Sequence, residues 1–414
     1  MAQTKQDCAP SSMETVEAYN KSATEHLRAR RFIEAEQAAQ SAFALSQPEN
    51  ETEYGQSFDI LCQTKIVQAA DKKHIDEVIA LCKEDTNRHG VKFWNQIHWG
   101  SAYYTSGDLE NAEKHYSVAR ELPMRATHRT IGVYSTRSLN WLQTKLAEPP
   151  KSNLLNQSPM LIKNMQNPAS DCLVFLLSCN SDYFQSWAEI FLASLSEVTE
   201  NGCVHFHLIQ ASTTDFELLL QLQKTFGDKI VLNCTYEEAP FLDSDVNPET
   251  RRAYYATSRY LRTSAIRKMY TQDIIVSDID LKFLSNPNSL KVKSENSDVG
   301  FRYSGPFGYF PWTRITANFC YVKANDATIE FFDGVAKYAA SVFEEGWKKR
   351  PLWYVDQNAL SFMEHLFSLV EPNVKFLNMN HSGTSKIVTF AQQNKKTFKQ
   401  EAGTPVQPES ARRQ

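Results

Sequence analysis

The sequence has little that would place the protein in or across a membrane. No apolar run approaches the length of a membrane span, and the N-terminal stretch MAQTKQDCAPSS lacks the apolar core of a secretory leader. No C-x-x-C pair occurs among the eight cysteines, which are Cys8, Cys62, Cys82, Cys172, Cys179, Cys203, Cys234 and Cys320. Scattered cysteines in apolar runs indicate free, buried thiols of a reducing compartment rather than disulfides or a zinc site. We therefore predict a cytoplasmic protein without a membrane span.

A strong excess of charge is also missing. Lys and Arg number 44 against 48 Asp and Glu, a formal net charge of −4, and the basic runs are short. This balance argues against nucleic acid as the main partner. With 414 residues, 42% of them hydrophobic and 12% aromatic, the chain has enough apolar material for two domains with ordinary cores.

The N-terminal third is helical and repetitive. We expect residues 1–15 to be disordered and residues 16–146 to form helical repeats. In the clearest copy, Gly100 and Ala112 allow two helices to approach closely and Gly107 supplies the turn between them. Small and aromatic residues fall at the positions typical of a tetratricopeptide repeat: Gly100, Tyr103, Gly107, Ala112, Tyr116, Ala119 and Pro123.

Two weaker copies precede this one. The first has Ala23, His26, Ala35, Ala39 and Ala42 at the same offsets, and the second has Ile66, Ala69, Val78 and Cys82. The pattern resembles a tetratricopeptide array of about three units, although an unrelated bundle with alanine-rich contacts stays open. Such arrays bind peptides or partner proteins, or mediate self-association.

Residues 147–170 are rich in proline, asparagine and serine and are predicted to be a linker. From residue 171 to about 392, strands and helices alternate, which predicts an α/β domain with helices on both faces of a sheet. Expected strands cover 172–179, 205–210, 229–234, 273–276, 298–303 and 318–324; expected helices cover 185–198, 214–226 and 248–269 and two later stretches. The tail, 393–414, is predicted to be disordered.

An aspartate pair follows one of these strands. Asp278 and Asp280 come directly after the buried run at 273–276, where open α/β sheets place their chemistry. Two carboxylates at a turning strand end can converge on one point and suit Mg²⁺ or Mn²⁺. The alternative is an ordinary turn or helix cap rich in aspartate.

The order of elements and four local motifs resemble the GT-A nucleotide-sugar glycosyltransferases. Within them the chain is most similar to the retaining family 8, which includes glycogenin and the lipooligosaccharide galactosyltransferases. The motifs are the loop after the first strand (178–183), Arg259, the S-D-I-D segment (277–280) and Asp356-Gln357. The resemblance covers roughly residues 171–390 and implies a GT-A mixed sheet flanked by helices, behind an all-α N-terminal domain.

The resemblance also implies how a nucleotide-sugar donor is held. Ser178, Asn180, Asp182 and Tyr183 would bind the nucleotide, with Tyr183 offering a ring on which the base can stack. Simple packing by Tyr183 is the alternative. Arg259 would reach the diphosphate or the donor sugar, a task suited to a fixed and permanently charged guanidinium.

For the metal, the resemblance implies Asp278 and Asp280 with a histidine from an H-x-x-G-x-x-K segment. The corresponding stretch has Asn380 at the expected position and His381 one residue later. We favour His381 because imidazole is the better Mn²⁺ ligand, with Asn380 as the alternative. Lys386 would meet the leaving diphosphate.

The implied catalytic residues are Asp356, Gln357 and Arg259. Asp356 would orient the acceptor hydroxyl or sugar, and Gln357 lies where retaining members place an amide near the reacting carbon. The acceptor would be a glycan, a lipid-linked glycan or a protein. No strong enzymic nucleophile is evident, which favours front-face attack, while inversion with Asp356 as base stays open.

The sequence departs from the family pattern at two places, and two functions other than sugar transfer stay open. Asn318-Phe319-Cys320 replaces a usual Asn-x-Gly, and Ser304–Trp312 is a Gly-, Pro- and aromatic-rich stretch without a counterpart in the family. The aromatic rings of Ser304–Trp312 could either stack on an acceptor sugar or form a hydrophobic plug. The rivals are a sugar nucleotidyltransferase, which usually has a glycine-rich first loop, and a non-catalytic interaction protein with a degenerate transferase-like domain.

Overall fold

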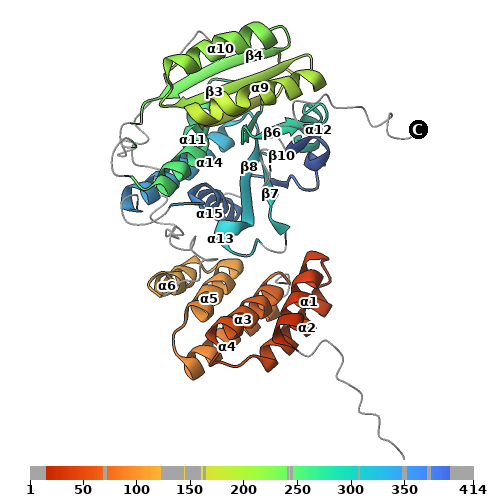
Figure 1. Ribbon diagram of the computed structural model, residues 1–414, viewed down its shortest axis with the longest axis vertical. Coiled ribbons are helices and arrows are strands. Elements are labelled where there is room, and N and C mark those ends of the chain that lie inside the picture. Colours follow the sequence, from red (N-terminus) through yellow and green to blue (C-terminus); the bar gives the residue numbers. More distant parts are fainter. Residues whose placement is uncertain are drawn as a thin grey trace, which may run out of the picture. The chain divides into compact units, whose positions relative to one another are not determined.

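The computed structural model describes residues 15–68, 72–122, 144, 160–161, 165–239, 242, 246–305, 308–346, 352–370 and 374–391. The chain divides into two compact units (Figure 1). The helical unit contains residues Met1–Ser138 together with Ser304–Arg314, and the sheet unit contains Leu139–Tyr303 and Ile315–Gln414. None of the helices in the described ranges is both long and apolar enough to cross a membrane. The predicted tails (1–15 and 393–414) fall almost entirely outside the described residues, as does most of the predicted linker.

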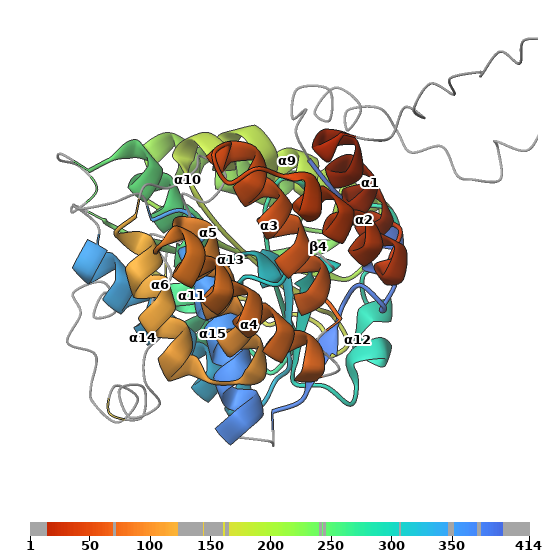
Figure 2. The same cartoon turned by 90° about the horizontal axis from the view of Figure 1, so that it is seen from below.

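The helical unit is a succession of antiparallel helix pairs. Its helices are α1 (Val16–Arg28), α2 (Phe32–Leu45), α3 (Glu51–Ile66), α4 (Lys72–His89), α5 (Phe93–Ser106) and α6 (Leu109–Arg120). Figure 2 shows them following one another across the unit from α1 to α6. The first helix of each pair also packs on the first helix of the next, α1 on α3 and α3 on α5. Consecutive hairpins therefore share one layer of helices, as expected of a repeat array.

The turn between α5 and α6 has the predicted structure. Gly107 ends α5 with a positive φ of 87°, and Asp108 caps α6 by accepting the N–H of Asn111 at 3.1 Å. Gly100 faces the ring of Tyr116, and a Cβ at Gly100 would lie 2.7 Å from that ring. Glycine is therefore required where the two helices cross.

A buried carboxylate ties the middle of this unit together. Asp85 in α4 is 4% exposed and accepts hydrogen bonds from Tyr54 (2.7 Å), Trp94 Nε1 (3.1 Å) and Asn95 Nδ2 (2.9 Å). These donors come from α3 and α5, so one carboxylate on α4 joins three helices. Three hydrogen bonds compensate for taking the charge out of water.

The sheet unit alternates strands with helices. Its strands are β1 (Met160–Leu161), β2 (Val174–Asn180), β3 (Gly202–Ile209), β4 (Ile230–Glu237), β5 (Ile274–Ser277), β6 (Leu281–Phe283), β7 (Val299–Tyr303), β8 (Ile315–Val322), β9 (Phe376–Asn378) and β10 (Val388–Phe390). Its helices are α9 (Ser181–Val198), α10 (Thr213–Phe226), α11 (Pro248–Arg267), α12 (Ser289–Ser294), α14 (Asp326–Gly346) and α15 (Val355–Val370), with a 3₁₀ helix η4 at Thr384–Lys386. The short helix α13 (Pro311–Arg314) belongs to the helical unit.

The sheet is mixed, with strand order β1-β4-β3-β2-β5-β8-β7-β9. β4, β3, β2 and β5 run parallel, β8 is antiparallel to β5 and β7, and β9 is parallel to β7. β6 and β10 form a separate antiparallel pair. The predicted α/β class with a mixed sheet is confirmed. One boundary was wrong: α9 begins at Ser181 rather than near Gln185, because the chain turns directly from β2 into the helix.

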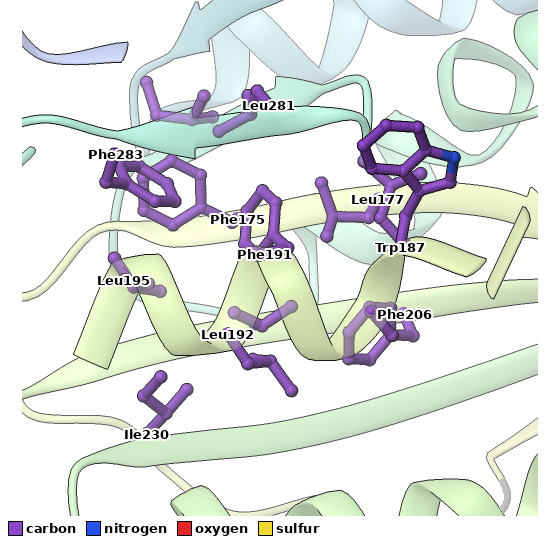
Figure 3. Close-up of a cluster of buried hydrophobic side chains, with 14 of the residues drawn as sticks. Phe175, Leu177, Trp187, Phe191, Leu192, Leu195, Phe206, Ile230, Leu281 and Phe283 are labelled. Carbon is purple, nitrogen blue, oxygen red and sulfur yellow. The ribbon is translucent and has the colours of Figure 1, made fainter. Parts of the chain in front are cut away.

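Alternate residues of the strands face two different layers. Phe175 and Leu177 of β2 pack with Phe206 of β3 against Phe191 and other apolar residues of α9 (Figure 3). The rings meet edge to face, with Phe175 and Phe191 centroids 5.9 Å apart. This apolar face forms the main core. The described cysteines are buried and free of disulfides, as predicted.

The opposite face is polar and packs against α11. Here Glu237 at the end of β4 is 2% exposed and accepts hydrogen bonds from Arg262 Nε (2.6 Å) and the Tyr254 hydroxyl (2.7 Å). His207 Nε2 lies 3.5 Å from the same carboxylate. Arg267, also buried, donates to the Gln272 carbonyl at 2.8 Å. Both arginines are therefore buried on this face, and Arg262 is paired with the Glu237 carboxylate.

We expect Glu237→Gln to lower the free energy of unfolding at pH 7 by about 3–5 kcal/mol, because it leaves the Arg262 guanidinium buried without its counter-charge. Burial raises the pKa of Glu237, but His207, Arg262 and Tyr254 outweigh it and hold the pKa at about 2, below the usual 4.5. The stabilisation is therefore complete above pH 4.5 and disappears as the pH falls toward 2. Urea unfolding at pH 7 and pH 3 measures both effects.

The matched control is Glu200→Gln. Glu200 pairs with Lys229 at 3.0 Å, but its side chain is 80% exposed, so its loss should change the free energy of unfolding by no more than about 0.5 kcal/mol. Equal effects of the two substitutions would contradict the role given to the buried pair.

Candidate active site

The predicted aspartate pair follows the carboxyl end of β5. Asp278 follows β5 directly, and its N–H donates to the Asn318 carbonyl of β8 at 3.1 Å. Asp280 is 8% exposed, and its carbonyl accepts the Ala391 N–H at 2.9 Å. Backbone hydrogen bonds on both residues therefore fix where the two carboxylates emerge from the sheet.

Arg259 of α11 lies at the centre of the site. Its guanidinium is buried and bonds to the Asp278 carboxylate, to the Ala317 carbonyl (3.0 Å) and, more weakly, to Asp356 Oδ2 (3.5 Å). Burial alone would lower the pKa of Arg259, but Asp278 and Asp356 raise it above its ordinary value. The residue predicted to contact the donor is therefore a fixed cation that already binds two carboxylates.

Asp356 stands at the start of α15 and is almost fully buried. It accepts the Gln357 N–H at 2.8 Å. Burial raises the pKa of Asp356, and the nearby Arg259 only partly opposes this shift. Tyr354, two residues earlier, has a positive φ of 70°, a conformation that costs energy in a residue other than glycine. A strained turn thus presents the beginning of α15 to the site.

These residues line one cavity of about 960 Å³. Of the predicted site residues, it brings together Ser178, Asn180, Asp182, Tyr183, Arg259, Asp278, Asp280, Asp356 and Gln357. Ser178 is held by a 2.6 Å hydrogen bond between its hydroxyl and that of Ser258 on α11. The volume suits a ligand of nucleotide-sugar size.

Two predicted residues, His381 and Lys386, are not among those lining the cavity. Both lie on the connection between β9 and β10, where the His381 N–H donates to Asn378 O at 3.1 Å and the Lys386 N–H donates to Gly383 O at 2.9 Å. Asn380 Nδ2 donates to the Tyr303 carbonyl at 2.6 Å. In the described part of the chain, no three His, Cys, Asp or Glu side chains come together in a metal-binding cluster. The third ligand therefore stays a prediction.

Sequence reasoning missed a set of cationic and aromatic residues around the cavity: Arg251, Arg252, Tyr255, Trp353 and Tyr354. The spacing along the sequence could have revealed some of these residues. Arg251, Tyr255 and Arg259 are spaced by four residues, so they follow one another along one face of α11. Trp353 and Tyr183 each keep 41% of their surface exposed. Exposed rings beside a cavity are suited to stacking on a base or a sugar.

Part of the chain matches a known protein family. Residues 229–407 match the family described as nucleotide-diphospho-sugar transferase. The match starts after β2 and β3, so the predicted nucleotide loop lies outside it. No curated protein sequence matches the chain.

Solved structures similar to the chain include three glycosyltransferases. Mouse xyloside xylosyltransferase 1 in its apo form has 12% identity and a TM-score of 0.32, over 50% of this chain and 84% of its own. The galactosyltransferase LgtC, in complex with donor and acceptor sugar analogs, has 13% identity and a TM-score of 0.35, over 58% and 99%. Apo GlyE from Streptococcus pneumoniae TIGR4 has 8% identity and a TM-score of 0.34, over 56% and 60%.

At these identities and TM-scores, the three alignments say nothing about the substrate of this chain. The family match covers the segment from β4 to β10 and includes Arg259, the aspartate pair and Asp356. Over residues 229–407 the chain therefore matches a nucleotide-diphospho-sugar transferase domain, which supports a glycosyltransferase activity for the sheet unit.

Proposed function

We propose that the sheet unit transfers a sugar from a nucleotide-diphosphate sugar to a hydroxyl acceptor, with retention of configuration and dependence on Mn²⁺ or Mg²⁺. The observation that carries the proposal is the single cavity at the ends of β2 and β5. It combines an aspartate pair, three arginines and exposed aromatic rings. The acceptor class is a glycan, a lipid-linked glycan or a protein.

The donor set of the cavity fits a hard divalent cation. Asp278 and Asp280 both reach the cavity, and carboxylate oxygens are the ligands that Mg²⁺ and Mn²⁺ prefer. The lining aspartates, four in number, exceed the three arginines Arg251, Arg252 and Arg259 by one charge. A diphosphate entering this cavity would therefore meet no surplus of positive charge from its lining residues. A bound cation would neutralise the departing diphosphate.

The third protein ligand in the proposal is His381, with Asn380 as the alternative. Both lie on the connection after β9, which would have to bring one of them to the aspartate pair. Lys386 on the same connection is proposed to meet the diphosphate. A closing movement of this connection is consistent with its high content of turns and one short 3₁₀ helix.

The remaining lining residues have complementary proposed roles. Ser178, Asn180 and Asp182 would bind the nucleotide where β2 passes into α9, and Tyr183 would stack on the base. Asp356 would accept a hydrogen bond from the acceptor hydroxyl, and Gln357 would lie beside the reacting carbon. Arg259 would hold Asp278 and Asp356 at fixed positions while its charge favours the diphosphate.

For the helical unit we propose a tetratricopeptide-type array. Packing of the first helix of each pair on the first helix of the next supports it, as does Gly100 against Tyr116. In this proposal the family of the transferase domain is glycosyltransferase family 8 and the protein acts in the cytoplasm.

We expect Asp280→Asn to abolish Mn²⁺-dependent binding of nucleotide-sugars, because the amide removes half of the anionic charge offered to the cation. Titration calorimetry against a panel of nucleotide-sugars with Mn²⁺ measures the affinity, and circular dichroism checks the fold. The control is Asp228→Asn, which changes an exposed aspartate in the α10–β4 connection and should leave affinity unchanged. Unaltered affinity in Asp280→Asn would contradict the metal role.

We expect Asp356→Asn to lower the rate of donor hydrolysis by about 100-fold or more, the size of a general-base contribution. The same substitution should raise the midpoint of thermal unfolding at pH 7 by on the order of 2 °C, because it removes a buried charge. The folded pKa of Asp356 is raised above the usual 3.8, so the charged form costs stability at pH 7 and protonation relieves the cost as the pH falls. The gain should therefore shrink toward pH 4.

Scanning calorimetry at both pH values separates the two outcomes for Asp356. A lower midpoint at pH 7 would mean that the Asp356 charge stabilises Arg259 by more than the free energy that its own burial costs. Full activity in the variant would exclude Asp356 from the reaction.

We expect Tyr183→Ala to raise the KM for the donor about tenfold, because stacking on a base contributes about 1–3 kcal/mol. Tyr183→Phe keeps the ring and should restore the KM, while kcat stays within twofold in both variants. Steady-state kinetics of donor hydrolysis provides the measurement. A loss of kcat with unchanged KM would assign Tyr183 to the chemical step instead.

A further inference from the structure

The segment Ser304–Arg314 connects β7 to β8 but belongs to the helical unit. Its two ends are held together, since the Ser304 N–H donates to the Arg314 carbonyl at 2.9 Å. Gly308 lies in the neck between them, where a Cβ would come within 3.0 Å of Arg314 Cα and 3.1 Å of Ser304 Cβ. The ends of the segment are therefore joined at a tight neck, where a side chain at position 308 would crowd Arg314 and Ser304.

The loop carries three aromatic rings in contact with one another. The centroids of Tyr309 and Phe310 are 4.0 Å apart, and those of Phe310 and Trp312 are 4.8 Å apart with nearly parallel planes. Trp312 is 1% exposed and Phe310 is 5% exposed. Rings of this size bury a large apolar area and need a matching surface.

That surface is provided by α5 and α6. His98 of α5 stacks on Tyr309 with centroids 5.8 Å apart and also contacts Phe310 at 5.6 Å. Tyr116 of α6 meets Trp312 edge to face at 5.4 Å. His98 is fully buried, and its Nε2 lies 2.8 Å from Asp59 of α3, which fixes the imidazole plane.

The helices are shaped to hold this loop. The Tyr116 ring that contacts Trp312 also packs directly on Gly100. The Tyr116 hydroxyl forms a 2.8 Å hydrogen bond with the Ser101 hydroxyl. Tyr309 packs against the core cluster of α3, α4 and α5. The loop thus completes the hydrophobic core of the array, rather than lying on its surface.

The neck of the loop continues into β8. Three residues after Arg314, the Ala317 carbonyl accepts hydrogen bonds from Arg259 (3.0 Å) and the Tyr260 hydroxyl (2.5 Å). Thr316 and Asn318, on either side of Ala317, line the donor cavity with it. The start of β8 is therefore both the exit of the loop and one wall of the cavity.

We propose that the helical array holds the chain's own loop Ser304–Arg314 as its ligand and thereby fixes the start of β8, so that the array sets the geometry of the donor cavity. The second half of this statement rests on the proposed function. His98 and Tyr116 are then occupied from within the chain, and an outside partner binds the array elsewhere.

The test compares full-length Trp312→Ala and Trp312→Phe with the unaltered protein. Hydrogen exchange followed by mass spectrometry reports on the amides of α5 and of residues 315–318, and calorimetry measures the affinity for Mn²⁺ with inorganic pyrophosphate. We expect Trp312→Ala to speed exchange at least tenfold in both places and to weaken pyrophosphate binding at least fivefold. Trp312→Phe restores both because it keeps an aromatic ring against Tyr116.

Should Trp312→Ala not fold, Tyr309→Ala is a second variant, because the Tyr309 ring is less completely buried than that of Trp312. The same direction of change is expected for both readouts. Ile33→Ala, at a side chain 70% exposed on α2, is the control and should change neither readout. Faster exchange in α5 with unchanged exchange at 315–318 would overturn the proposal. Failure of the unaltered protein to bind Mn²⁺–pyrophosphate would contradict the proposed function, whereas the exchange data would still decide the role of the loop.

Discussion

The buried guanidinium of Arg259 is the interaction on which the site depends. It joins Asp278 after β5, the Ala317 carbonyl of β8 and Asp356 at the start of α15, three points far apart in the sequence. A charge in this position is stable only while those oxygens surround it, because desolvation of an unpaired guanidinium costs several kcal/mol. One side chain thus holds together the three segments that carry these oxygens.

The same principle extends along α11. Arg262 is paired with Glu237 of β4, and Arg267 donates to the Gln272 carbonyl ahead of β5. Each of these buried arginines of the helix therefore bonds to an oxygen of the sheet or of the segment that leads into it. Apolar packing would tolerate small slips of a helix over a sheet, whereas these charges accept one register only. The polar face of the sheet therefore specifies the position of α11, while the apolar face of α9 supplies most of the hydrophobic stabilisation.

Much of this arrangement could be predicted from the sequence because it is local. The apolar runs predicted the strands, and the strand end before Asp278 predicted the site edge. The role of Trp353 could not be predicted, because it reaches the cavity only through the strained turn at Tyr354. Nor does the aromatic stretch Ser304–Trp312 reveal its own binding surface, since that surface lies on helices some two hundred residues earlier in the chain.

At the loop Ser304–Arg314 the chain leaves the sheet after β7 and returns as β8 to pair with the same strand. Tyr303 pairs with Ile315 and Arg302 with Thr316, so the ladder closes directly below the neck. Between Phe301 and Arg302 the register shifts, since Phe301 pairs with Cys320 whereas Arg302 pairs with Thr316. Closing a longer loop costs only about 0.6 kcal/mol for each doubling of its length. Burial of Phe310 and Trp312 contributes about 1.5–3 kcal/mol for a ring the size of Phe, which exceeds that cost. The docked rings therefore favour the closed neck, and the closed neck fixes where β8 begins.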